Sequence, residues 1–239
     1  CLIEAYTKLN TDLKLVIVGD APYNKKYINF VKNINMLETI LSWDTQLLLL
    51  INHARTGFLD IILYLVSQQY FWIPLYAAVL ILLIIHYKKK SWAYILLFVI
   101  LLLFTDQSSV MIKKSVKRLR PCHEPEIATN VILIKNKCGG KYSFVSSHAT
   151  NCTGFAVLAW LLLKPFANKK WKKWIMGITL FGLYAFAVGY SRAYLGVHYP
   201  IDILCGAILG AFLGWLVYWS SHKIFPKLFS FSLKDNYNS

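Results

Sequence analysis

The chain has 239 residues, of which 57% are hydrophobic, and 26 Lys and Arg against 11 Asp and Glu give it a formal net charge of +15. The apolar residues cluster in long runs and the basic residues lie at the ends of those runs, which is typical of a membrane protein rather than a soluble domain. The same distribution argues against nucleic acid as the partner of the positive charge and favours membrane lipid.

The first 35 residues differ from the rest of the chain. Residues 13–22 predict a buried strand that ends in a turn, and an amphipathic segment, residues 2–9, precedes it. Together they resemble a helix–strand piece of a nucleotide-sugar glycosyltransferase with two Rossmann domains. Because a lone strand cannot form a domain, we interpret residues 1–35 as a truncated fusion or as sequence foreign to the natural protein, with Met36 as a natural start. No signal peptide is expected, so the first membrane helix would direct insertion.

From residue 37 onward the sequence predicts an all-α fold, an integral membrane helical bundle of five or six transmembrane helices with an interfacial N-terminal helix. Residues 43–51 are amphipathic, and Trp43 can anchor them at the membrane surface. Whether residues 45–67 cross the bilayer or lie along it stays open. The apolar runs that predict spans, together with their flanks, are 71–86, 92–105, 150–163, 174–190 and 203–219.

The start and the surface of the last span carry small or rigid residues. Gly196 allows a tight bend before it, and Pro200 marks the first turn of its helix. Gly206, Gly210 and Gly214 form a stripe of small residues that lets a neighbouring helix approach closely. We therefore expect close helix packing along this stripe.

Three polar clusters lie among the apolar runs. The first is residues 113–121, Lys-Lys-Ser-Val-Lys-Arg-Leu-Arg-Pro; the second is 146–148, Ser-Ser-His; the third lies within 191–202. Together they supply fixed cations, two imidazoles, hydroxyl groups and a carboxylate, an inventory that suits an anionic substrate, a nucleophile and a proton donor. Charges beside apolar spans are costly, so these clusters indicate a functional site.

The spacing within the clusters resembles the type-2 phosphatidic acid phosphatase family, which includes bacterial undecaprenyl-pyrophosphate phosphatases and lipid A phosphatases. The shared features are a lysine, six residues and Arg-Pro; Ser-x-His; and Ser-Arg, five residues, His, three residues and Asp. In the second motif Val145 and Ser147 stand where the family usually has Pro and Gly, and Ser147 still offers a backbone N–H to a phosphate. The resemblance implies a membrane phosphatase domain over residues 36–222.

Catalytic roles follow from the resemblance. It implies that His198 attacks phosphorus to give a phosphohistidine, and that His148 is the acid toward the leaving group and later the base for water. Asp202 lies four residues after His198, on the same face if the segment is helical, where a carboxylate can orient the imidazole and stabilise its cationic form.

Phosphate binding is expected from cations and hydrogen-bond donors in the same clusters. Lys113, Arg120 and Arg192 can supply positive charge, and the planar arginine fork fits two phosphate oxygens. Ser146 and Ser147 can add hydrogen bonds at the beginning of a helix, whose N-terminus favours an anion.

Basic residues at the ends of the spans predict the orientation in the membrane. Lys88–Lys90, the turn at 164–173 and a basic tail at 223–239 are expected in the cytoplasm. Counting spans then places the three clusters on the extracytoplasmic face, in a bacterial inner membrane. The loop between the first two clusters is also basic, which conflicts with the simple rule. We give precedence to keeping the clusters together, because any other span count would split the site.

Two classes of function use such a site, a lipid-phosphate phosphatase and a non-catalytic membrane protein that binds anionic lipid, such as a flippase or carrier. Only the enzyme requires both histidines and Asp202 together. A haloperoxidase would share the anion site, but a membrane-embedded chain argues against it. Candidate substrates are undecaprenyl pyrophosphate, phosphatidylglycerol phosphate, phosphatidic acid and lipid A phosphate. An extracytoplasmic site favours a polyprenyl or lipid diphosphate, while the oligomeric state stays open.

We expect no metal or other cofactor, because the sequence shows neither zinc-ligand spacing nor a cluster of acidic residues. His53, His86, His123 and His222 are interpreted as structural or solvated. Cys152 and Cys205 fall within spans and should be buried thiols. Cys122 and Cys138 flank the loop between the first two clusters. They would form a disulfide if that loop faces an oxidising compartment, and stay free thiols otherwise.

Overall fold

The structure is a computed structural model in which residues 24–229 are described, and within that range the regular elements are helices, with one isolated β-bridge. The chain divides into two compact units, Cys1–Trp43 and Asp44–Ser239. Helix α2, Asn24–His53, begins in the first unit and ends in the second. The segments expected at 2–9 and 13–22, and the tail beyond residue 229, lie outside the described residues. The predicted all-α class is confirmed for the part of the chain that the structure describes.

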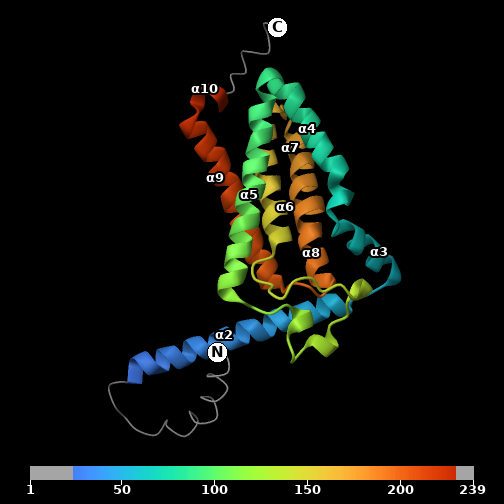
Figure 1. The fold of residues 1–239 in the computed structure, drawn as a ribbon, viewed down its shortest axis with the longest axis vertical. Helices are drawn as coiled ribbons and strands as arrows, with labels where there is room; N and C mark the ends of the chain where they lie inside the picture. The colour runs from blue at the N-terminus through green and yellow to red at the C-terminus, as the bar shows by residue number, and fades with distance from the viewer. Residues whose placement is uncertain (1–23, 230–239) are drawn as a thin grey trace. The chain divides into compact units, whose positions relative to one another are not determined.

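The second unit is a bundle of helices that lie side by side (Figure 1). Short connecting helices η2, Gln69–Trp72, and η3, Lys88–Lys90, join its first members. The π-helical stretch η8, Ile178–Phe186, continues α7 into α8. The α-helices of this unit after α2 are α3 Gly57–Val66, α4 Ile73–Tyr87, α5 Ser91–Val116, α6 Ser147–Leu163, α7 Lys170–Gly177, α8 Ala187–Tyr194, α9 Pro200–Ile224 and α10 Pro226–Phe229.

The apolar helices have the length that a membrane requires. Among the described residues, three helical stretches are long and apolar enough to cross a bilayer, namely Gln69–Val116, Lys170–Tyr194 and Pro200–Ile224. A fourth is added if Asn35–His53 and Gly57–Val66, which are bent by 115° relative to each other, count as one span. The chain is therefore an integral membrane protein. Residues 45–67 form two helices with a sharp bend between them rather than one straight helix.

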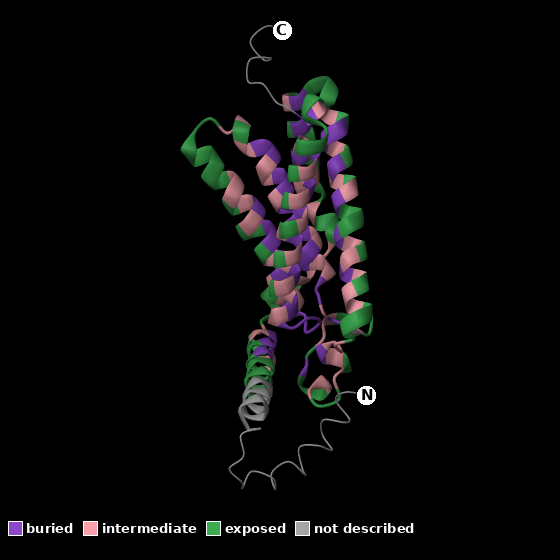
Figure 2. Ribbon diagram, turned by 90° about the vertical axis from the view of Figure 1, so that its left-hand side faces the viewer, coloured by how far each residue is buried: buried purple, intermediate pink, exposed green. Residues whose placement is uncertain are grey.

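Burial follows the inward faces of the bundle (Figure 2). The core contains aromatic and aliphatic side chains from several helices, including Tyr94, Leu158 and Tyr184. Large apolar side chains such as Leu103 and Ile208 are exposed on the outside. Helices that satisfy their own backbone groups and expose apolar side chains are suited to contact with lipid tails.

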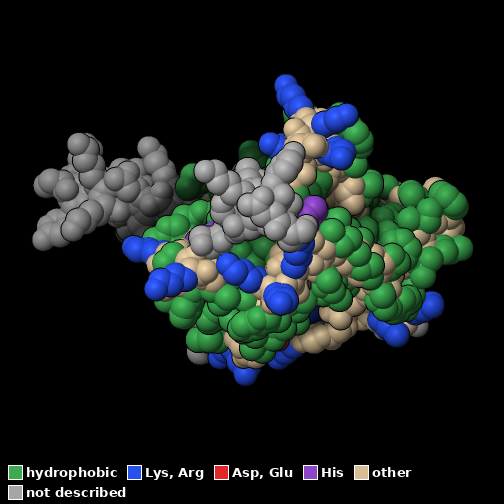
Figure 3. All heavy atoms as spheres, turned by 90° about the horizontal axis from the view of Figure 1, so that it is seen from above, with side chains coloured by type: hydrophobic (Ala, Val, Ile, Leu, Met, Phe, Trp, Pro, Cys, Tyr) green, Lys and Arg blue, Asp and Glu red, His purple; other side chains and the backbone are tan. Residues whose placement is uncertain are grey.

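The three polar clusters lie at one end of the bundle. They occupy the end of α5, the beginning of α6, the end of α8 and the beginning of α9, which meet at the lower end in Figure 1. The turn at Lys88–Lys90 and the connection after α6 lie at the other end. Figure 3 looks onto that other end, where Lys and Arg side chains gather among hydrophobic ones.

Helices α6 and α9 pack closely along the predicted glycine stripe. A Cβ placed on Gly206 would lie 2.7 Å from the Ser146 carbonyl oxygen, and one on Gly214 would lie 2.6 Å from the Gly154 carbonyl oxygen. At Gly210 the distance to the Thr150 carbonyl oxygen would be only 2.1 Å. Because rigid backbone occupies this space, the contact requires glycine, and the predicted close approach is confirmed.

Gly210→Ala should therefore destabilise the protein, because the added methyl group must push α6 and α9 apart. We expect a loss of about 1–3 kcal/mol in the free energy of unfolding, the usual cost of overpacking a core. Thermal unfolding in detergent measures it. Gly182→Ala is the matched control, since the nearest atom to its Cβ would be Ile178 Cγ2 at 3.9 Å. Equal unfolding temperatures for the two variants would contradict the role of the stripe.

Candidate active site

A buried ion-pair network organises the polar end of the bundle. Arg118, in the loop after α5, donates from Nη1 to Asp202 Oδ1 at 2.8 Å and from Nη2 to Asp44 Oδ2 at 2.7 Å. Both carboxylates are buried, and the guanidinium carbon lies 3.7 Å from the centre of the Tyr199 ring. Asp44 also accepts a hydrogen bond from the Ile201 N–H at 2.8 Å. One arginine thus joins α2 to the beginning of α9.

His198 and Asp202 are neighbours because of how α9 begins. His198 precedes the helix, so the segment is not helical throughout and the condition for a shared helical face is not met. Tyr199 is the N-cap, and its N–H donates to Asp202 Oδ2 at 3.0 Å, which turns the carboxylate back toward the loop. His198 Nδ1 lies 3.7 Å from the same oxygen, an ion-pair distance rather than a hydrogen bond.

Positive charge surrounds the buried imidazole of His198. Burial, and next the charges of Arg120, Arg192 and Lys113, hold the pKa of His198 well below its ordinary value. The same three cations act on His148, which is also within electrostatic range of His198. The structure therefore brings both histidines and the three expected cations into one site. A neutral His198 keeps its lone pair, as a nucleophile requires.

Ser147 links the end of α5 to the beginning of α6. Its hydroxyl accepts a hydrogen bond from Lys113 Nζ and lies 2.7 Å from Ser109 Oγ. Ser146 has a different place, because it is fully buried and its hydroxyl caps α6 by accepting the Ala149 N–H. Of the two serines expected to bind phosphate, Ser147 is thus the one whose hydroxyl is next to a cation.

The backbone of Ser146 connects the second cluster, 146–148, to the third, 191–202. Its N–H donates to the backbone oxygen of Asp202 at 3.0 Å. This bond holds the beginning of α6, and with it His148, against the beginning of α9. The link adds to the glycine contacts farther along the same pair of helices.

Two arginines stand at the site with different partners. Arg120 is held by three backbone carbonyl groups, those of Cys138, Tyr142 and Val197. Arg192 lies near the end of α8. Within residues 24–229, its buried Nε has no hydrogen-bond partner, and neither has His198 Nδ1. Buried donors without partners are costly, so an anionic ligand would satisfy Arg192 Nε, whereas His198 Nδ1 is directed to Asp202.

Asn52 is a structural residue that the motifs did not reveal. Its side-chain amide donates to the carbonyl groups of Tyr194 at 2.7 Å and Ile132 at 2.9 Å, and its Oδ1 accepts the Ile132 N–H at 2.8 Å. Gly196 has a φ of +69°, and a Cβ there would lie 2.4 Å from a methyl group of Val131. The loop after α5 is thereby tied to the turn that carries His198.

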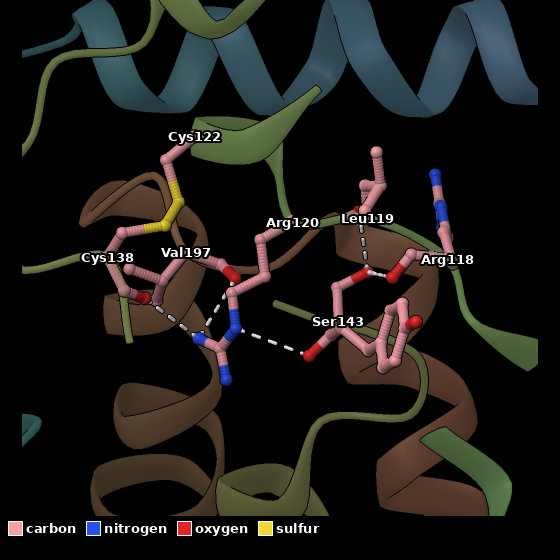
Figure 4. The surroundings of a disulfide bond; sticks show 8 residues. Arg118, Leu119, Arg120, Cys122, Cys138, Ser143 and Val197 are labelled. Carbon is pink, nitrogen blue, oxygen red and sulfur yellow. Dashed lines mark hydrogen bonds between the residues drawn. A yellow bond between two sulfur atoms is a disulfide. The ribbon is translucent and has the colours of Figure 1, made fainter. Parts of the chain in front are cut away.

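Cys122 and Cys138 are joined in a disulfide with a Cα–Cα distance of 6.1 Å (Figure 4). His123 lies beside them, and its ring nitrogen and the two sulfurs are within 4.8 Å of one another. A metal would need both sulfurs as thiolates, and in this structure they are used in the disulfide. Among the described residues, this is the single cluster with metal-ligand geometry.

A cavity of about 480 Å³ opens beside His148. Its walls come from α3 to α6, η2, η8 and α8. Asp106, Ser147 and Asn151 make one part polar, and the Oδ1 of Asn151 is buried without a partner among the described residues. Aromatic and aliphatic side chains form most of the rest, including Trp72, Tyr76, Phe98, Phe155, Tyr184 and Val188.

This arrangement has groups that a phosphatase site can use, namely cations, a buried neutral imidazole, a second imidazole beside a largely apolar cavity of about 480 Å³ and a carboxylate near the first. Residues 91–226 match the PAP2 superfamily. The chain therefore belongs to this superfamily of membrane lipid phosphatases, which confirms the resemblance in the motifs, and it is a hydrolase of lipid phosphates.

Similar proteins agree with this assignment. The lipid A 4'-phosphatase of Bacteroides thetaiotaomicron is 34% identical over 196 residues, which cover 81% of this chain and 83% of that protein. The lipid A 4'-phosphatase of Porphyromonas gingivalis is 34% identical and covers 76% of this chain and 74% of its own length. The crystal structure of a transmembrane PAP2 phosphatidylglycerolphosphate phosphatase from Bacillus subtilis has a TM-score of 0.59 at 25% identity, covering 78% of this chain and 88% of that chain.

Arg118→Ala should damage both stability and turnover, because it leaves two buried carboxylates without their cation. Removing one partner of a buried ion pair costs about 3–5 kcal/mol, and the loss should also release Asp202 from its position near His198. Thermal unfolding and phosphate release in detergent test this. Lys114→Ala, at an exposed position in the same segment, is the control. Wild-type stability and rate in Arg118→Ala would show that the network is dispensable.

Proposed function

We propose that this chain hydrolyses a phosphate monoester of lipid A and releases inorganic phosphate. The observation that carries the proposal is the cavity that begins at His148, because it offers space for the leaving group next to the residue that would protonate it. The two lipid A 4'-phosphatases that resemble most of the chain support the same substrate.

The proposed mechanism uses the chain's own residues in two steps. His148 takes up a proton when the phosphate of the substrate offsets the charges of Lys113, Arg120 and Arg192. His198 then attacks phosphorus and forms a phosphohistidine, while His148 gives that proton to the leaving oxygen. His148 then takes a proton from water, which attacks the phosphohistidine and releases inorganic phosphate. Asp202 stabilises the imidazole of His198 as it gains charge. Lys113, Arg120 and Arg192 neutralise the phosphate oxygens, and the Ser147 hydroxyl can donate a hydrogen bond to one of them.

The composition of the cavity favours a glycolipid leaving group. Asp106 can accept hydrogen bonds from sugar hydroxyl or amide groups, and the unpartnered Oδ1 of Asn151 can do the same. The aromatic walls suit acyl chains and sugar rings. A polyprenyl diphosphate, which the sequence alone favoured, has no sugar hydroxyls to use these acceptors.

We place the site on the extracytoplasmic face of a bacterial inner membrane, in a bundle of five or six spans. α4, α5, α6, the α7–η8–α8 segment and α9 would be five of them, and the bent α2–α3 pair would lie along the surface or form the sixth. The three motifs meet at one end of these helices, as this topology requires. The phosphatase domain would extend over residues 36–222, followed by the basic tail.

Purified protein in detergent should release inorganic phosphate from lipid A, and mass spectrometry should show lipid A that has lost one phosphate group. His198→Ala should lower the rate by on the order of 10⁴-fold or more while the protein stays folded, because the nucleophile is lost. Asp202→Asn should be slowed less, since the imidazole remains. Lipid A binding without phosphate release by the wild type would contradict lipid A as the substrate.

Chelators should not inhibit the reaction, because the proposed mechanism relies on Lys and Arg for charge stabilisation. Phosphate release is measured before and after dialysis against EDTA, and the expected rates are equal. A loss of activity that magnesium or zinc restores would overturn the metal-free mechanism.

A further inference from the structure

We propose that the Cys122–Cys138 disulfide is a positioning element for the phosphate-binding Arg120, so that reduction of this bond weakens phosphate binding and turnover. The inference rests on the proposed function of Arg120. The two cysteines would then affect the reaction through the side chain of Arg120.

Arg120 contacts the backbone of one of the two bridged cysteines. Arg120 Nη1 donates to the carbonyl oxygen of Cys138 at 3.1 Å (Figure 4). The backbone of Arg120 lies two residues before Cys122. One half of the disulfide therefore follows Arg120 in the chain, and the other half holds its side chain.

The backbone after Cys138 is shaped to lie against the guanidinium group. Gly139 has a φ of +89°, a conformation that favours glycine, and a Cβ there would lie 3.2 Å from Arg120 Nη1. A larger residue at this position would press on the arginine. The segment that the disulfide secures is thus in close contact with the phosphate-binding side chain.

The same arginine is also tied to the nucleophile. Its Nη1 donates to the carbonyl oxygen of Val197 at 3.4 Å, and Val197 is the residue before His198. Its Nε donates to the carbonyl oxygen of Tyr142 at 3.3 Å. These contacts fix the plane of the guanidinium group relative to the imidazole that would attack phosphorus.

None of the three bonds uses Arg120 Nη2, which points away from the disulfide in Figure 4. The hydrogen bonds of Nη1 and Nε orient the guanidinium group, and Nη2 is left to bind a phosphate oxygen. If Cys138 moves, Arg120 loses one of the hydrogen bonds that orient its guanidinium group, and the position of Nη2 is less well defined. A misplacement of about 1 Å can cost 100-fold in rate.

The test combines the disulfide with the arginine. Cys122→Ser/Cys138→Ser is made in the wild type and in Arg120→Ala, and each protein is assayed for kcat and KM with lipid A. Its affinity for inorganic phosphate is measured by competition and by direct titration. In the wild-type background we expect kcat/KM to fall at least about tenfold, with weaker phosphate binding. In the Arg120→Ala background the same serine pair should cost less than about twofold, because the residue through which it acts is gone.

Equal losses in both backgrounds, or no loss in the wild type, would overturn the proposal. Thermal unfolding separates this from a stability effect, because a purely structural bridge would lower stability and activity equally with and without Arg120. Cys205→Ser is the control for loss of a thiol. If lipid A is not the substrate, the titration with inorganic phosphate still tests the link to Arg120.

A second experiment uses the wild-type protein and so does not depend on variants that could fail to fold. Wild-type protein is purified oxidised and treated with dithiothreitol, which gives two electrons and two protons to the disulfide and becomes a cyclic disulfide itself. Counting alkylated thiols shows when Cys122 and Cys138 are free. Activity and phosphate affinity should fall on reduction and return on reoxidation, whereas unchanged values in the fully reduced protein would refute the coupling.

Discussion

The close contact between α6 and α9 is the constraint on which the site depends. His148 stands in the first turn of α6, and His198 immediately precedes α9. Glycines on α9 leave no side chain between the two backbones, and the Ser146 N–H bonds directly to the backbone of Asp202. The relative position of the two imidazoles is therefore set by backbone packing. Backbone contacts of this kind are rigid, which suits the proposed reaction, in which His198 and His148 act on the same phosphate ester.

Electrostatics explains why this end of the bundle is poised for an anion. The carboxylates of Asp44 and Asp202 are both bonded to Arg118. Among the described residues neither forms an ion pair with Arg120 or Arg192, although Asp202 lies within electrostatic range of Arg120. Those two arginines and a neutral His198 are packed in a buried region where unpaired charge is costly. In the proposed mechanism the phosphate of the substrate supplies negative charge to these cations, which favours its binding.

The motifs predicted the residues proposed for the chemistry better than the residues that hold them in position. Local spacing within 113–121, 146–148 and 191–202 was enough to identify the family, and apolar runs were enough to locate the helices. Asp44 and Asn52 could not be found this way, because they contact residues 74 to 157 positions away and stand in an ordinary amphipathic helix. The pairing of His198 with Asp202 was expected from spacing, but it arises from an N-cap. Sequence period alone does not distinguish that geometry from a shared helical face.

The contacts of the loop between α5 and α6 bear on its apparent conflict with the positive-inside rule. Arg118 is compensated by two carboxylates, and Arg120 donates to the backbone carbonyl groups of Cys138, Tyr142 and Val197. Lys135 lies with its Nζ 4.2 Å from the centre of the Tyr64 ring, and Lys141 Nζ lies 5.9 Å from that of Tyr142. Part of the loop's positive charge is therefore in contact with neighbouring side chains. The lysines at the opposite end of the bundle stand at exposed turns, as residues that interact with anionic headgroups do, and some of them make similar contacts. Lys223 Nζ lies 4.6 Å from the centre of the Trp219 ring, and Lys90 Nζ donates to the Lys227 carbonyl oxygen at 3.4 Å. A count of Lys and Arg at the two ends therefore compares side chains that are similarly engaged.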